Sequence, residues 1–239
     1  MKNPLNQRQN NAMIRGRHPE LRKDTKGAAV EMIRLLWNLL CPIFFYGLCV
    51  DLFTLLLGQQ DPLAGTLAGA LAAAPFLARQ YMRDPPFEKR ESGVDKKAWV
   101  LYVFAGIAGC FVVNTLIKMS RVSRLFSGFS RTAKTIYQSP WLLQAGAVGI
   151  GIPVAEELVF RGLVFARLRK KMDFWAAAGL SAALFALYHG NVLQGVYAFL
   201  MGLLFSWIME REKTIGAPLV THMAANFTSL AMTAVQGIR

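Results

Sequence analysis

Long apolar runs occupy most of this 239-residue chain, and they constrain its fold more than any other feature. The sequence is 54% hydrophobic and only 17% charged, with a mean hydropathy of +0.34. A helix of about 20 apolar residues is long enough to cross a bilayer. We therefore predict an all-α polytopic transmembrane bundle of about seven spans. Seven runs of spanning or nearly spanning length lie at residues 35–57, 62–79, 98–117, 140–165, 174–189, 192–209 and 215–235.

The charged residues, which give a net charge of +13, lie mainly outside these runs. Residues 1–28 are polar and basic and predict a flexible cytoplasmic arm, followed by one transmembrane domain at 29–239. Lys and Arg mark loops that face anionic cytoplasmic lipid, so the basic clusters at 79–97 and 167–171 favour the same side. The basic connection 118–139 then falls on the opposite side, against this rule, and its location stays open. No aromatic and basic nucleic-acid motif occurs, so lipid rather than nucleic acid is the expected partner.

Two adjacent glutamates, Glu156 and Glu157, lie inside the fourth apolar run. A charged side chain at the bilayer centre costs about 2.5–3.5 kcal/mol on insertion scales, so both carboxylates need partners or a task. Neighbouring residues of an α-helix point about 100° apart, so the two cannot do the same job. Arg161 follows Glu157 by four residues, which is the favourable order for an ion pair. We predict a Glu157–Arg161 pair, and a partner for Glu156 on another helix.

Polar groups that could meet Glu156 occur on two other runs. His189 ends the fifth run, with Phe185 one turn earlier, and the tight junction at 189–191 must be buried in protein or line a wet cavity. His222 and Asn226 share one face of the seventh run. A carboxylate with a histidine can take a proton from water, and a His/Asn pair can stabilise an oxyanion. Together they predict amide hydrolysis without a covalent intermediate, although any one of them could serve only as an interhelical hydrogen bond.

Other kinds of site have weaker support. No Gly-x-Ser-x-Gly, His-Glu-x-x-His or glycine-rich phosphate loop occurs, and Cys41, Cys49 and Cys110 lie in apolar runs as expected free thiols. One carboxylate and two histidines could hold a zinc ion, but we expect neither a metal nor a cofactor. The alternative function is a non-catalytic immunity or scaffold protein that binds a peptide in the same polar cavity. A small transporter would show inverted repeats or paired broken helices, and none is visible.

Three motifs in order carry a family resemblance. They are Glu156-Glu157-x-x-x-Arg161 at 156–161, Phe185-x-x-x-His189 at 185–189 and His222-x-x-x-Asn226 at 222–226. Together they resemble the CPBP intramembrane protease family, which comprises the CAAX prenyl endopeptidases and the bacteriocin-processing or Abi-type bacterial proteins. The resemblance covers about residues 145–230. It implies an all-helical transmembrane bundle, so that about seven to eight spans are expected, and an intramembrane glutamic endopeptidase with its catalytic site inside the bundle.

The resemblance also implies roles for the motif residues. Glu156 activates water with the help of His189, while His222 and Asn226 stabilise the oxyanion. No catalytic metal is implied. The implied substrate is a small peptide or a prenylated, membrane-associated peptide, and the compact chain suits the cell membrane of a bacterium or archaeon. The supporting positions of the same motifs are Glu157, Arg161 and Phe185.

Overall fold

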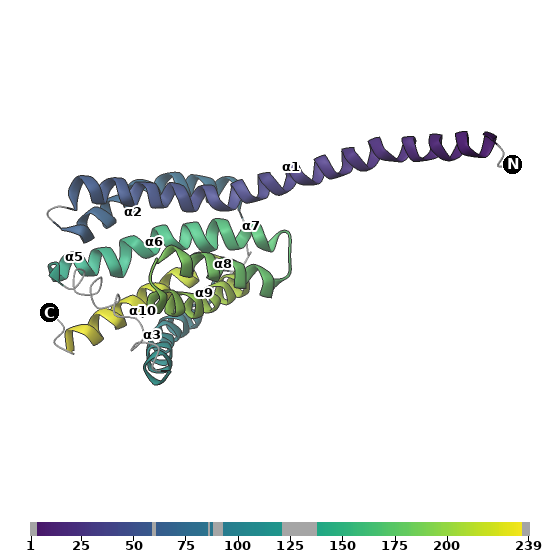
Figure 1. The fold of residues 1–239 in the computed structure, drawn as a ribbon. Coiled ribbons are helices and arrows are strands. Elements are labelled where there is room, and N and C mark those ends of the chain that lie inside the picture. Colours follow the sequence, from purple (N-terminus) through teal and green to yellow (C-terminus); the bar gives the residue numbers. More distant parts are fainter. Residues whose placement is uncertain (1–3, 59–60, 86, 88–92, 121–137, 236–239) are drawn as a thin grey trace. The chain divides into compact units, whose positions relative to one another are not determined.

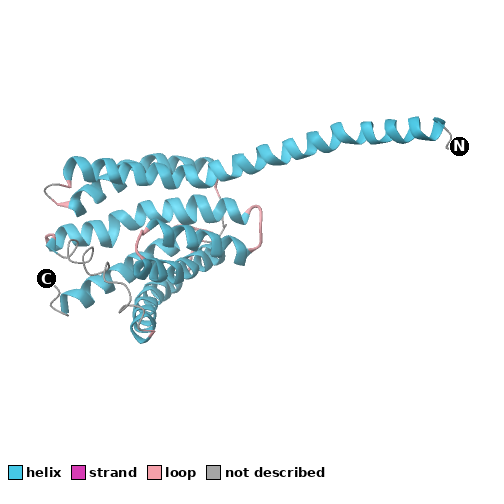
Figure 2. Cartoon of the chain, in the orientation of Figure 1, coloured by secondary structure: helices cyan, strands magenta, loops and turns pink. Residues whose placement is uncertain are grey.

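The computed structural model describes residues 4–58, 61–85, 87, 93–120 and 138–235, with side chains from residue 27 onward. All regular secondary structure in these segments is helical (Figure 2). The predicted all-α class is therefore confirmed. The helices and π-helical turns are α1 (Pro4–Leu57), α2 (Pro62–Arg83), α3 (Lys96–Met119), α5 (Trp141–Gly146), η2 (Ala147–Gly151), α6 (Ile152–Glu157), η3 (Leu158–Phe165), α7 (Ala166–Arg169), α8 (Phe174–Tyr188), α9 (Val192–Glu212) and α10 (Gly216–Val235).

The chain forms two compact units, residues 1–40 and 41–239. In the first unit the backbone is helical from Pro4 onward, including the described part of the predicted arm. Whether that arm is flexible, and whether it is cytoplasmic, stay predictions. From residue 27 the exposed side chains of this unit include large apolar groups such as Ile33 and Trp37.

In the second unit the five segments from α5 to α7 continue one another as a single helical rod over Trp141–Arg169. The rod contacts α2 on one side and α8, α9 and α10 on another, and α3 packs against α9 and α10 (Figure 1). The glutamate-bearing segment α6 is thus surrounded by helices, as a set of charges inside an apolar bundle requires.

Glycines allow several of these helices to approach closely. A Cβ atom on Gly69 would lie 2.5 Å from the backbone of Val50, and one on Gly65 would lie 2.6 Å from that of Thr54. These two glycines therefore let α2 pack backbone to backbone on the end of α1, as small residues four apart do in membrane helices. Gly106 does the same for α3, because its Cβ would lie 2.2 Å from the carbonyl oxygen of Thr221 on α10.

Three described segments are long and apolar enough to cross a membrane by length and composition: Gly27–Leu57, α3 and α9. The shorter α8 is also apolar. Large hydrophobic side chains remain exposed on these helices, for example Phe104 on α3 and Leu187 on α8. An apolar outer surface of this kind is what lipid contact requires, and the fold is that of a helical membrane protein. The basic connection at 118–139 lies largely outside the described residues.

Candidate active site

The rod departs from regular α-helix on both sides of the glutamates, and Pro153 explains the first departure. In the π-helical turn η2 the N–H of Ile152 donates to the carbonyl of Ala147, five residues earlier. In the same register the carbonyl of Val148 should receive the N–H of residue 153, but proline has none. The side chain of Asn226 supplies the missing donor, with Nδ2 2.8 Å from the Val148 oxygen. Asn226 therefore ties α10 to the rod.

Glu157 and Arg161 form the predicted ion pair, which is confirmed. Arg161 Nη1 lies 3.2 Å from Glu157 Oε1, and both side chains are fully buried. The guanidinium group also lies over two rings, 4.4 Å from the centroid of Phe185 and 4.9 Å from that of Phe205. A buried guanidinium is stabilised by such contacts, worth about 2 kcal/mol each when desolvated. The ion pair and the two aromatic rings thus form a buried, closely packed group next to the site.

His222 contacts both glutamates. Its Nδ1 lies 2.8 Å from Glu157 Oε1, and its Nε2 lies 3.7 Å from Glu156 Oε2. Because the same Glu157 oxygen also receives the Arg161 guanidinium, it accepts here as well and the histidine Nδ1–H donates. The ring of Phe205 stacks on the imidazole with centroids 4.7 Å apart and fixes its plane. The Nε2 atom is therefore the one presented to Glu156.

His189 lies where α8 ends. Gly190, with a positive φ of 63°, terminates the helix in a left-handed conformation that suits glycine. Asn191 then caps α9 by accepting from the backbone N–H groups of Leu193 and Gln194. The His189 Nδ1 lies 2.8 Å from the carbonyl oxygen of Phe185. A carbonyl can only accept, so Nδ1 carries the proton and a neutral ring keeps Nε2 free as a base.

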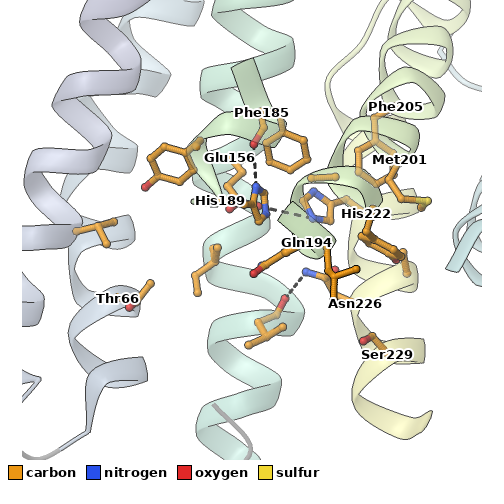
Figure 3. A pocket seen from close by; sticks show the side chains of 18 of the residues that line it. Thr66, Glu156, Phe185, His189, Gln194, Met201, Phe205, His222, Asn226 and Ser229 are labelled. Atoms are coloured by element: carbon orange, nitrogen blue, oxygen red, sulfur yellow. Dashed lines mark hydrogen bonds and ion pairs between the residues drawn. The ribbon is translucent and has the colours of Figure 1, made fainter. Parts of the chain in front are cut away.

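One cavity of about 960 Å³ collects the four predicted catalytic residues (Figure 3). Glu156, His189, His222 and Asn226 all line it, as does Phe185. The junction after α8 therefore lines a cavity, as its position predicted. Glu156 is only 6% exposed, yet its carboxylate belongs to the cavity wall. Of the two candidate histidines, His222 and not His189 has a nitrogen within 4.0 Å of the Glu156 carboxylate.

The cavity extends from Glu156 away from the basic cluster at 167–171. Its lining includes Thr66 near the start of α2, Asn114 near the end of α3 and Ser229 on α10, but no residue between 157 and 184. Figure 3 shows Thr66 and Ser229 farther along the cavity than Glu156. The lining therefore reaches Glu156 from the side of Thr66, Asn114 and Ser229 and not from the side of the 167–171 cluster. The buried pair and Phe185 close that end.

Sequence reasoning missed several residues of the site. Phe205 gave no signal, because it is one aromatic residue within an apolar helix. Tyr46 and Tyr188 line the cavity with their rings stacked 5.2 Å apart, and they too lie in apolar runs without a motif. Asp51 did carry a signal as an acid inside the first apolar run, and the structure places it in the cavity lining.

Within the described part of the chain, no group of three or more His, Cys, Asp and Glu side chains has the arrangement of a metal site. Cys41, Cys49 and Cys110 are free thiols. Glu156 and the two histidines remain the groups whose chemistry would suit a metal, and their independence of one stays a prediction.

The segment that carries the three motifs is similar in sequence to known proteins. Residues 138–228 match the Rce1-like family, described as type II CAAX prenyl endopeptidase. The predicted resemblance is confirmed, and the matched segment holds all three motifs. The chain is 30% identical over 74 residues to the "Putative membrane peptidase YdiL" of Bacillus subtilis (strain 168), covering 31% of this chain and 30% of that protein.

A second relative is the "UPF0177 protein YxdF" of Lactococcus lactis subsp. lactis (strain IL1403). It is 24% identical over 131 residues, which are 54% of this chain and 72% of that protein. The chain thus spans less than a third of the length of YdiL in that match. No solved structure matches the chain. The comparisons therefore show a resemblance to CAAX-type membrane proteases over the segment that holds the site.

Proposed function

We propose that the protein is an intramembrane glutamic endopeptidase that hydrolyses a peptide bond of a small or membrane-associated peptide. The observation that carries this proposal is the single cavity lined by Glu156, His189, His222 and Asn226 within an apolar helical bundle. Its lining combines a carboxylate, a histidine base and further hydrogen-bond donors, which are the groups that water-mediated amide hydrolysis needs.

In the proposed reaction Glu156 takes a proton from a water molecule while the water oxygen attacks the scissile carbonyl carbon. His189 orients that water through Nε2, since its Nδ1–H is committed to the Phe185 carbonyl. The tetrahedral intermediate carries its negative charge on the former carbonyl oxygen. When the C–N bond breaks, the proton held by Glu156 passes to the leaving amine, so that the free carboxylate is restored.

His222 and Asn226 stabilise the oxyanion in this scheme. Glu157 holds Nδ1 of His222, so a protonated ring presents Nε2–H near Glu156 as a fixed donor. Asn226 uses one amide hydrogen for the Val148 carbonyl and keeps the second for the substrate. Preorganised donors of this kind are worth about 2.7–4 kcal/mol each when they meet a developing oxyanion.

The cell membrane of a bacterium or archaeon, with a cytoplasmic N-terminus, is the proposed location. The N-terminal arm and the 167–171 cluster are both basic, which supports a place on the cytoplasmic side of the membrane for each. Cleavage of matched farnesylated and unmodified peptides tests whether the substrate carries a prenyl group.

The decisive experiment compares the peptides of membranes that contain the wild-type protein or its Glu156→Gln variant. We expect at least one peptide product to disappear with the variant, and the purified wild-type protein to regenerate it from its precursor. Glu31→Gln is the matched control, because Glu31 is exposed on α1 and does not line the cavity. Full activity of Glu156→Gln would overturn the protease and favour a non-catalytic peptide-binding protein.

A further inference from the structure

Asp51 is an unneutralised acid on the wall of the cavity. It lies in the apolar stretch Gly27–Leu57, whose mean hydropathy is 2.1. Its side chain is exposed and lines the same cavity as Glu156. Among the described residues no Lys, Arg or His nitrogen lies within 4.0 Å of its carboxylate. The charge therefore has no ion-pair partner within the described part of the protein.

A carboxylate in this position is energetically unfavourable unless it remains hydrated or binds a ligand. A carboxylate on an apolar helix loses hydration if it meets lipid, so such residues usually face a cavity and mark a substrate pathway. Asp51 follows this pattern, because Tyr46, Gly47 and Val50 of the same helix also line the cavity. The face of α1 that carries Asp51 is thus the face that the substrate contacts in the proposed reaction.

Contacts along the wall connect Asp51 to the reacting groups. Asp51 lies five residues after Tyr46, which is about 7.5 Å along the helix. The Tyr46 ring stacks on Tyr188 at 5.2 Å, and the Tyr188 ring lies 6.3 Å from that of His189. Asp51 is therefore connected to His189 along the lining of one cavity, in which an extended peptide would rise about 3.3 Å per residue. It can contact a side chain close to the scissile bond.

The residues that line the cavity from α3 and α10 have a different character. Lys118 and Asn114 line it from α3, and Asn226 and Ser229 line it from α10. Lys118 is also exposed and lies too far from Asp51 to pair with it. Away from Glu156, the α1 wall therefore offers a single negative charge, and a positively charged group is the ligand that would offset it.

We propose that Asp51 determines specificity by binding a cationic group of the substrate peptide, either a Lys or Arg side chain or a free α-amino group. This proposal rests on the proposed function in taking the cavity as the peptide site. The ion pair forms at a hydrated cavity wall, so it selects among peptides while the cleavage step itself depends on Glu156 and the histidines.

The test measures peptide binding and cleavage separately. Fluorescent eight-residue peptides of one sequence carry Lys, norleucine or Glu at each position in turn, and each is made with a free or an acetylated N-terminus. Binding is measured by fluorescence anisotropy to the Glu156→Gln protein, which leaves the peptides intact. We expect Lys at one position, or the free amine, to bind about tenfold or more tightly than its neutral counterpart.

Variants of Asp51 then test whether this residue causes the preference for a cationic peptide. In the Glu156→Gln background, Asp51→Asn should abolish the preference, and Asp51→Lys should invert it so that the Glu peptide binds best. Glu31→Lys is the matched charge change on the same helix outside the cavity and should leave the preference intact. Thermal unfolding measures whether the Asp51 variants are folded. We expect them to be, because the Asp51 side chain is exposed.

Each result has a defined meaning. An unchanged Lys preference in Asp51→Asn would overturn the specificity proposal, while cleavage by the wild type and not by Glu156→Gln would still support the protease. A preference that depends on Asp51, without cleavage by the wild type, would keep the cation site and overturn the protease. Failure of every peptide to bind would overturn both.

Discussion

His222 donates from Nδ1 to Oε1 of Glu157 across 2.8 Å, deep inside the helical bundle. The same carboxylate oxygen receives Arg161, so one glutamate holds a histidine of the cavity and a fully buried guanidinium together. Two adjacent glutamates therefore have separate tasks. Glu157 orients the groups below the cavity, and its neighbour Glu156 faces the cavity with the carboxylate that we propose to be the base.

Replacement of Glu157 by Gln should destabilise the protein by about 3–5 kcal/mol, because it leaves the Arg161 charge buried without a counterion. Thermal or denaturant unfolding in detergent measures the change. Activity should fall as well, since His222 loses the acceptor that fixes its ring.

The control for that variant removes the other charge. Arg161→Met should also destabilise the protein, but adding it to Glu157→Gln should cost much less than the separate effects together, because no unpaired charge then remains. Additive losses in the double variant would contradict a direct buried pair. The pair Arg169 and Glu210, which is 3.2 Å apart and partly exposed, provides a comparison. Its removal should cost only about 0–1 kcal/mol.

Asn226→Ala should destabilise the rod by leaving the Val148 carbonyl without a donor. The cost of such an unsatisfied group is about 1–3 kcal/mol, and unfolding in detergent measures it. A second substitution tests the reason. Pro153→Ala restores an N–H at the position that the π-helical register needs, so the Asn226→Ala/Pro153→Ala protein should regain part of the lost stability.

The same pair of variants separates structure from chemistry at Asn226. If the double variant recovers stability but not the catalytic rate, the amide acts on the substrate as well as on the rod. If Pro153→Ala has no effect on the Asn226→Ala protein, the missing proline N–H is not the reason for the Asn226 contact.

The helix positions could be predicted from the sequence because an apolar run of membrane length has few alternatives to a helix. The Glu157–Arg161 pair could be predicted because its spacing alone brings the two side chains onto one face. Which histidine meets Glu156 could not, because that depends on how α8 and α10 pack on the rod. The π-helical turns and the stacking of Phe205 on His222 could not be predicted either, since neither follows from local sequence. The side from which the cavity opens depends on all of these helices together.

Packing of α3 against α10 should control the site through Gly106. A Cβ there would lie 2.2 Å from the carbonyl oxygen of Thr221, the residue before His222. Gly106→Ala must therefore displace α10, and we expect a loss of about 1–3 kcal/mol in stability together with reduced cleavage. Unfolding and peptide cleavage measure the two effects.

Gly109 provides the matched control on the same helix. A Cβ there would meet the end of the flexible Met201 side chain at 3.1 Å, which can move aside. Alanine is also the better helix former by about 1 kcal/mol, so Gly109→Ala should be close to neutral. Equal losses in the two variants would show that the α3–α10 approach is not the reason for the effect at Gly106.

Cleavage should survive exhaustive treatment with a zinc chelator such as 1,10-phenanthroline. Ligands of a tetrahedral zinc ion lie about 3.4 Å apart, given zinc–ligand distances of about 2.0–2.2 Å. His222 Nε2 and Glu156 Oε2, at 3.7 Å, come close to that spacing, but no nitrogen of His189 lies within 4.0 Å of Glu156. A carboxylate on the far nitrogen of a histidine, as Glu157 is here, also occurs behind zinc ligands, so the measurement decides between two real alternatives. Loss of activity that added zinc restores would establish a metalloprotease, whereas unchanged rates, with Glu156→Gln still inactive, would support a metal-independent glutamate base.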